Sequence, residues 1–135
     1  MALQFSAAVR NARLDAIETT IGATAVLKIR SGSVPADCAT ADTGTVLATL
    51  TLPSDWMAAA SGGSKAKSGT WQDSSADATG TAAHFRIYDS TGTTCHLQGT
   101  VTATGGGGDL TLDNTSIASG QSITINTFSI TAANA

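Results

Sequence analysis

The chain has 135 residues, of which 41% are hydrophobic, 4% are aromatic and 13% are charged. This length suits a single domain, whose core must be built mainly from Ala, Val, Leu and Ile because aromatic side chains are scarce. The net charge of −3 argues against nucleic acid as the main partner, and no apolar run approaches the ~20 residues of a membrane span.

The low content of charged residues also limits which residues can form the surface. It must be covered largely by Thr, Ser, Gly and Ala, and such a surface carries little solubilising charge. This composition suits a protein that packs against neighbours, although a Thr- and Ser-rich monomer would share it. The sequence shows no classical signal peptide, so we expect synthesis in the cytoplasm.

Residues 1–22 predict an amphipathic N-terminal helix. Ser6 suits the N-cap position, and Gly22 suits the position where a helix stops. The predicted apolar surface consists of Phe5, Val9, Ala12 and Ala16, extended by Leu14, Ile17 and Ile21. The predicted polar side consists of Arg10, Asn11, Asp15 and Glu18. Such a helix would either cover the domain's own sheet or reach onto a partner.

Residues 23–135 predict a β domain, with short runs rich in Thr, Val and Ile between turn signals. Segments 25–30 and 46–52 alternate apolar and polar residues, and segment 31–45 between them is predicted to be a long loop. The expected core-facing residues of the two strands are Ala25, Leu27 and Ile29, then Val46, Ala48, Leu50 and Leu52. Six or more strands after one helix predict a mainly β fold, either an antiparallel β-sandwich or a jelly roll.

Residues 82–101 give the clearest local prediction, a β-hairpin. A turn over residues 89–92 would pair Asp89 with Thr93, so that Ile87 lies opposite Cys95. In this register every apolar side chain falls on one face. The other face is predicted to be polar, with both histidines at the surface, and to carry His84, Arg86, Tyr88, Thr94, His96 and Gln98.

The C-terminal part predicts a glycine-rich turn at residues 104–109, a short strand after it, and a longer strand at 121–132. In the longer strand Ile123 and Ile125 share one parity, whereas Phe128 and Ile130 share the other. A bulge near residue 126 or 127, or burial on both faces, would explain this switch.

Segment 56–71 begins and ends with the only two tryptophans of the chain. Its glycine- and lysine-containing run does not match a Walker phosphate loop, because the lysine spacing differs and no helix pattern follows. We interpret the segment as a loop that docks on a partner, or as a disordered connector that becomes ordered on assembly. Trp56 and Trp71 would then anchor the loop ends or pack on the partner, and Lys65 and Lys67 would be solvated.

No group of residues predicts catalysis. His84 and His96 share a predicted face, but Arg86 lies beside them and no carboxylate completes a metal site. Cys95 and His96 point to opposite faces of a strand, so they do not form a nucleophile–base pair. We therefore expect no enzymatic activity, no cofactor and no metal ion.

Cys38 and Cys95 are the only cysteines, too few for a disulfide framework in a chain of this size. We favour two reduced, partly buried thiols. A single bridge stays open as the alternative if the protein leaves the reducing cell.

Nearly the whole chain resembles short proteins encoded in the structural modules of tailed phages and prophages. Three stretches carry the resemblance: MALQFSAAVRNARLDAIETTIG, LKIRSGSVPADCATADTGTVLATLTLPSDWM and GTAAHFRIYDSTGTTCHLQGTV. Within that group the chain is most similar to capsid decoration, or cement, proteins. The resemblance implies a small β-sandwich or jelly roll that forms a dimer or trimer. It also implies that the protein is made in the host cytoplasm and binds the major capsid protein on the outside of the expanded capsid.

The predicted partner interface combines the helix with the tryptophan-flanked segment. Its residues are Phe5, Val9, Arg10, Arg13, Trp56, Lys65, Lys67 and Trp71. The acidic loop around Asp37 and Asp42 is a further candidate contact. Two alternatives stay open. A tail, baseplate or fibre-associated protein would bind a carbohydrate or receptor through exposed aromatic side chains, for which Trp56, Trp71 and Tyr88 are the candidates. A cell-wall hydrolase would need an essential Asp or His.

Overall fold

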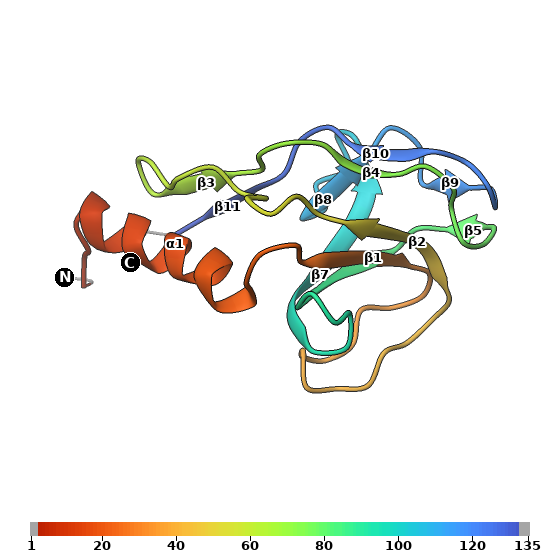
Figure 1. Cartoon of the computed structure of the whole chain (residues 1–135), viewed down its shortest axis with the longest axis horizontal. Coiled ribbons are helices and arrows are strands. Elements are labelled where there is room, and N and C mark those ends of the chain that lie inside the picture. Colours follow the sequence, from red (N-terminus) through yellow and green to blue (C-terminus); the bar gives the residue numbers. More distant parts are fainter. Residues whose placement is uncertain (1–2, 133–135) are drawn as a thin grey trace.

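The computed structural model describes residues 3–132, a mainly β protein with one helix near its N-terminus (Figure 1). Helix α1 spans Ala7–Ile21. The strands are β1 (Val26–Arg30), β2 (Val46–Thr51), β3 (Ser64–Ala66), β4 (Trp71–Asp73), β5 (Gly80–Thr81), β6 (His84–Tyr88), β7 (Cys95–Ala103), β8 (Leu110–Leu112), β9 (Ser116–Ile117), β10 (Ile123–Ile125) and β11 (Ser129–Thr131).

Both ends of α1 lie where the sequence places them. The Ser6 hydroxyl accepts a hydrogen bond from the backbone N–H of Val9 at 3.2 Å, which satisfies a donor that the first helical turn leaves without a partner. Gly22 ends the helix with a positive φ of 92°, and its N–H donates to the carbonyl of Glu18 at 2.8 Å. Such a φ is readily adopted only by glycine, so Gly22 suits this position.

A five-stranded sheet in the order β2-β1-β6-β7-β8 forms the main body. Its pairs are antiparallel except β7–β8, which is parallel although only the short segment 104–109 connects the two strands. Positive φ angles at Gly105 and Gly107 allow the chain to reverse within this segment. Three further two-stranded ladders are β10–β4, β11–β3 and β5–β9. Strand β4 lies beside β2 and β10 lies beside β8, so the strands curl around one core.

Aromatic side chains fill the centre of this core. Trp56 and Trp71 are both 0% exposed, and their ring centroids are 6.0 Å apart. Phe128 lies 5.5 Å from the Trp71 ring and 5.8 Å from the Phe85 ring, so it joins the tryptophans to the main sheet. Burial of both rings confirms the interpretation that Trp56 and Trp71 anchor the ends of segment 56–71, and it contradicts the alternative that they pack on a partner. The segment is ordered, includes β3, and anchors itself through both rings.

The β6–β7 hairpin is present, but its register differs from the predicted one. Ile87 lies opposite Leu97, and a bulge then places Tyr88 opposite Cys95. The loop is longer than predicted, because the Asp89 N–H donates to the carbonyl of Thr94 at 3.1 Å. Directly opposed antiparallel residues project to the same face. The bulge therefore moves Cys95 from the face of Ile87 to the face of Tyr88.

The long strand predicted at 121–132 is divided into β10 and β11. Ile123, Ile125 and Phe128 are all buried, and the break between the strands accounts for the switch in parity. In β2, Leu47 is buried together with the predicted Ala48 and Leu50. Ile29 of β1 pairs with Ala48, whereas Arg30 pairs with Val46. Leu47 therefore has no partner on β1 and is the extra residue of a bulge in β2.

Candidate functional site

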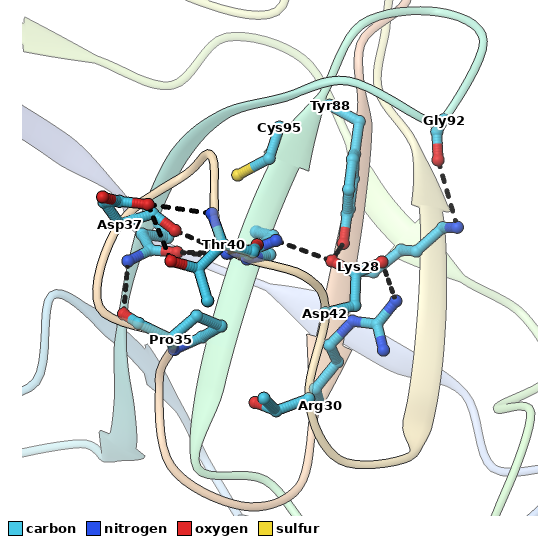
Figure 2. Close-up of polar contacts among 12 residues, drawn as sticks. Lys28, Arg30, Pro35, Asp37, Thr40, Asp42, Tyr88, Gly92 and Cys95 are labelled. Carbon is cyan, nitrogen blue, oxygen red and sulfur yellow. Dashed lines mark hydrogen bonds and ion pairs between the residues drawn. The ribbon is translucent and has the colours of Figure 1, made fainter.

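Loop 31–45 covers the face of the sheet that the sequence predicts to be polar and exposed. His84, Arg86 and Tyr88 alternate along β6 on this face, and all three are buried. Figure 2 shows the loop crossing the strands, with Asp37, Thr40 and Asp42 above the sheet. The prediction of a solvated face is wrong for these three side chains because a segment of the same chain covers it.

Arg86, which is 2% exposed, is the main anchor of the loop. Its Nη1 donates to Asp42 Oδ1 at 2.7 Å, and its Nη2 donates to the backbone carbonyls of Asp37 at 2.8 Å and Thr40 at 2.9 Å. Its Nε and Nη2 also donate to Gln98 Oε1 at 3.1 and 2.8 Å. The planar guanidinium thus binds three points of the loop and one neighbouring strand, which a single ammonium group could not match.

Asp42 is the anion at the centre of the loop contact. Its Oδ1 accepts from Arg86 and from the Tyr88 hydroxyl at 2.7 Å, and its Oδ2 accepts from Arg30 Nη2 at 3.0 Å. Burial opposes the charged form, but the hydrogen bonds from Tyr88 and Arg86 and the charge of Arg30 outweigh it. The pKa of Asp42 is therefore lowered, and the carboxylate stays ionised at neutral pH.

His84 lies next to this pair of arginines and is 0% exposed. Its Nδ1 lies 2.8 Å from the carbonyl of Gly32, which can only accept, so the neutral ring carries its proton on Nδ1. Its Nε2 has no hydrogen-bond partner among the described residues. Burial, and then the charges of Arg30 and Arg86, lower the pKa of His84, although Asp42 and the Gly32 carbonyl oppose them.

The side chains of this network bond to one another and to their own chain, so the network holds loop 31–45 on the sheet. The hydrogen bonds of Arg86, Asp42 and Tyr88 join these side chains to one another and to the loop backbone. Residues 3–132 contain no group of three His, Cys, Asp or Glu side chains that could hold a metal ion. The sequence missed this network. Its only signal was that two aspartates in loop 31–45 face a strand that carries an arginine on its polar side.

A second buried cation, Lys65, holds the helix. This side chain is 2% exposed, and its Nζ lies 2.7 Å from Asp15 Oδ1, 3.0 Å from Glu18 Oε2 and 2.9 Å from the carbonyl of Ala58. Burial opposes the charged lysine, but the hydrogen bonds that Lys65 donates to Asp15 and Glu18 outweigh it and raise the pKa of Lys65. The same contact lowers the pKa of Asp15. The prediction of a solvated Lys65 is therefore wrong.

The predicted polar side of α1 is consequently the side that packs on the protein. Arg10 Nε donates to the carbonyl of Ala132 at 2.9 Å, and Asn11 Oδ1 accepts from the Gly63 N–H at 2.9 Å. Leu14 and Ile21 are buried between these polar contacts and the core. The helix thus belongs to its own domain, and it lies at one end of the molecule beside β3 and β11 (Figure 1).

The predicted apolar surface of the helix is divided, since Leu14 and Ile21 are buried whereas the stripe that begins with Phe5 and Val9 faces outward. Phe5 is 37% exposed and Val9 is 44% exposed, and Ala12 and Ala16 are exposed as well. The Arg13 guanidinium lies 5.3 Å from the centroid of the Phe5 ring. We call the surface of Phe5, Val9, Ala12, Arg13 and Ala16 the outer stripe of α1.

The predicted interface residues therefore fall into three groups. Phe5, Val9 and Arg13 lie together on the outer stripe. Arg10 and Lys67 are half-buried, and Lys67 donates to the carbonyl of Gly69 at 2.8 Å. Trp56, Trp71 and Lys65 are buried, so they are not available to a partner on this folded surface. The sequence could not separate these groups, because an aromatic or aliphatic side chain is equally suited to a core and to an interface.

Comparisons with protein-family models, with curated proteins and with solved structures find no match to this chain. Among the described residues, no helix is long and apolar enough to cross a membrane.

Proposed function

We propose that this protein is a structural component of a tailed-phage virion, a decoration protein that binds the outer surface of the expanded capsid and bridges major capsid subunits. The outer stripe of α1 is the observation that carries the proposal. Helices of globular domains usually turn their apolar side inward, but this helix packs through polar contacts together with Leu14 and Ile21, and it leaves Phe5 and Val9 exposed. The sequence resemblance to phage structural proteins names the class of partner.

The arrangement of α1 suits a docking element. Lys65, Arg10 and Asn11 fix the helix from the inner side, so the outer stripe is presented without a cost of ordering the helix on binding. The nearby Leu3 is 74% exposed and extends the apolar surface toward the N-terminus. An apolar patch on a low-charge surface favours contact with another protein over contact with a charged polymer.

We also infer that the curled sheet is a variant of the β-sandwich or jelly roll. The sheet β2-β1-β6-β7-β8 would form one layer, and the ladders β10–β4 and β11–β3 would form the facing layer. The contact of Phe128 with both Trp71 and Phe85 supports this division, because it links a residue beside β11 to each layer.

The proposed mechanism is linkage between binding and shell stability. A ligand that binds only the expanded shell stabilises that state by its binding free energy. The shell offers many symmetric copies of one site, and a homo-oligomer that engages several of them binds far more tightly than one contact would. A dimer or trimer that places several outer stripes on adjacent capsid subunits would therefore act as a clamp.

The first test is the copy number of the protein in purified phage particles, measured by quantitative mass spectrometry against the major capsid protein. A copy number that scales with the capsid protein supports a decoration role. A few copies per particle would instead place the protein in the tail or fibre, and its absence would overturn the virion proposal.

The second test is a double substitution, Phe5→Ser with Val9→Ser, in a sedimentation assay with expanded shells. Burying these side chains is worth roughly 1.5–3 kcal/mol each, so we expect shell affinity to fall at least tenfold. The free energy of unfolding should change by less than about 0.5 kcal/mol, because neither side chain is in the core. Val34→Ser is the matched control, since Val34 is 36% exposed but lies in loop 31–45. Wild-type affinity in the double variant would remove the outer stripe from the binding site.

The alternative of a carbohydrate-binding tail or fibre protein has less support. Its candidate stacking residues were Trp56, Trp71 and Tyr88, and all three are buried. Of the six aromatic side chains in the chain, Phe5 is the exposed one, and it already contacts Arg13. Glycan-array binding that is lost on Phe5→Ser would revive this alternative.

A further inference from the structure

We propose that Cys38 and Cys95 are a redox-active pair that closes into an intramolecular disulfide and locks loop 31–45 onto the sheet. The co-reactant is a disulfide oxidant, such as glutathione disulfide or the active-site disulfide of a thiol oxidase. This bond is independent of the outer stripe and of the shell-binding proposal.

The bulge in the β6–β7 hairpin places Cys95 on the correct side of the sheet. Cys95 lies opposite Tyr88, and the Tyr88 hydroxyl contacts Asp42 of the loop. The two side chains share a face, so Cys95 also projects toward the loop. Figure 2 shows the Cys95 sulfur pointing toward the part of the loop that carries Asp37 and Thr40. Without the bulge this thiol would face the core.

Hydrogen bonds between loop 31–45 and the sheet hold Cys38 over the same face. It lies within a turn in which the Thr40 N–H donates to the Asp37 carbonyl at 3.2 Å and to Asp37 Oδ1 at 2.8 Å. The carbonyls at both ends of this turn accept from Arg86, and the Pro35 carbonyl accepts from Gln98 at 2.7 Å. These contacts hold the backbone on both sides of Cys38. The folded state therefore keeps Cys38 over the face of the sheet that carries Cys95.

The Cys38 thiol lies near enough to Cys95 to affect its ionisation. Burial first, and then the hydrogen bond and charge interaction with Cys38, raise the pKa of Cys95 to about 12, although the Arg86 guanidinium partly opposes them. Both cysteines are reduced in this structure and half-buried, so small oxidants can reach them. Two half-buried thiols, one on the loop and one on the sheet face that the loop covers, lie on segments distant in sequence and are suitably placed for a disulfide.

The reaction proceeds by thiol–disulfide exchange. Cys95 stays protonated near neutral pH, so the Cys38 thiolate attacks the oxidant, forms a mixed disulfide and releases one glutathione thiolate. Cys95 then loses its proton, attacks Cys38 Sγ and releases the second glutathione thiolate. Two cysteine thiols lose two electrons and two protons, and one glutathione disulfide becomes two glutathione molecules. Arg86 stabilises the transient Cys95 thiolate, and Cys38 no longer opposes its ionisation.

The test treats the reduced, folded protein with glutathione disulfide, alkylates the remaining thiols and measures the intact mass. We expect a product that has lost two hydrogens and carries neither glutathione nor alkyl groups. Trypsin leaves Cys38 in peptide 31–65 and Cys95 in peptide 87–135, so a disulfide-linked pair of these two peptides identifies the bond. Cys95→Ser should instead accumulate glutathione on Cys38.

A second readout separates this bond from incidental oxidation. A cross-link that closes a long loop stabilises the folded state, so the oxidised wild type should melt roughly 5 to 15 °C above the reduced protein. Cys38→Ser and Cys95→Ser should show no such difference between the two conditions. Two alkylated cysteines, glutathione on both cysteines, a dimer linked between chains, or a bridged protein with an unchanged or lower Tm would each overturn the proposal.

Discussion

Loop 31–45 and segment 56–71 look alike in sequence, since both are long, poor in charge and rich in small residues. In the folded protein each is fixed by one buried cation, Arg86 for the loop and Lys65 for the segment with helix α1. In both regions a charged side chain that the sequence places on a polar face or in a solvated loop is instead covered by a distant part of the same chain.

The two anchors differ in the partners that they satisfy. Arg86 binds two backbone carbonyls of the loop, Gln98 and the carboxylate of Asp42, so it fixes the loop at several points through directed hydrogen bonds. Lys65 mainly serves Asp15 and Glu18, whose side chains are 48% and 19% exposed and can return to water. The loop therefore depends on the geometry of one guanidinium, whereas the helix depends mostly on charge.

The largest expected effect is that of Arg86→Met. Removing the guanidinium leaves the Asp37 and Thr40 carbonyls and Gln98 without this donor and removes one ion pair from Asp42, so we expect a loss of about 3 kcal/mol in the free energy of unfolding. Chemical denaturation measures the loss, and hydrogen exchange should show faster exchange across residues 31–45. Arg86→Lys keeps the charge and tests geometry, so it should recover less than half of the loss. Full recovery by lysine would show that charge alone holds the loop.

Lys65→Met should have a smaller effect, about 1 to 2 kcal/mol, because the two carboxylates that it pairs can be hydrated. The lost stability should be greater at low salt than at high salt, since the interaction is mostly ionic. Lys67→Met is the matched control, because Lys67 is half-buried and forms no ion pair among the described residues. Equal losses for Lys65→Met and Arg86→Met would remove the distinction between the two anchors.

The smallest expected effect is a change in the pH dependence of stability, through His84 beneath loop 31–45. The folded pKa of His84 is lowered, so the native state binds fewer protons than the unfolded state below about pH 6.5. Its contribution is fully present above that pH and is lost as the pH falls toward the folded pKa. His84→Asn keeps a donor for the Gly32 carbonyl but does not titrate, so stability should vary less between pH 7.5 and pH 5. His96→Asn, at an exposed position, should keep the wild-type slope.

Local patterns predicted much of the fold. The helix with its Ser6 cap and Gly22 stop, the two early strands, the hairpin and the short strand at 110–112 are confirmed, because each depends on neighbouring residues alone. The exact register of the hairpin was wrong because a longer loop and a bulge satisfy the same alternation. The outer stripe of α1 was predicted as apolar, but whether it was buried did not follow from periodicity.

The sequence by itself therefore determined which elements form and which residues share a face. Alternation along a strand and the period of a helix are set by backbone geometry, so they can be read from neighbouring residues. What covers each face depends on the tertiary structure. It turns the polar side of α1 inward onto Lys65, and it lays loop 31–45, which carries Cys38, over the sheet face of Arg86 and Cys95. These contacts join residues far apart in the chain, and their energies depend on burial and hydrogen-bond geometry that no local pattern contains.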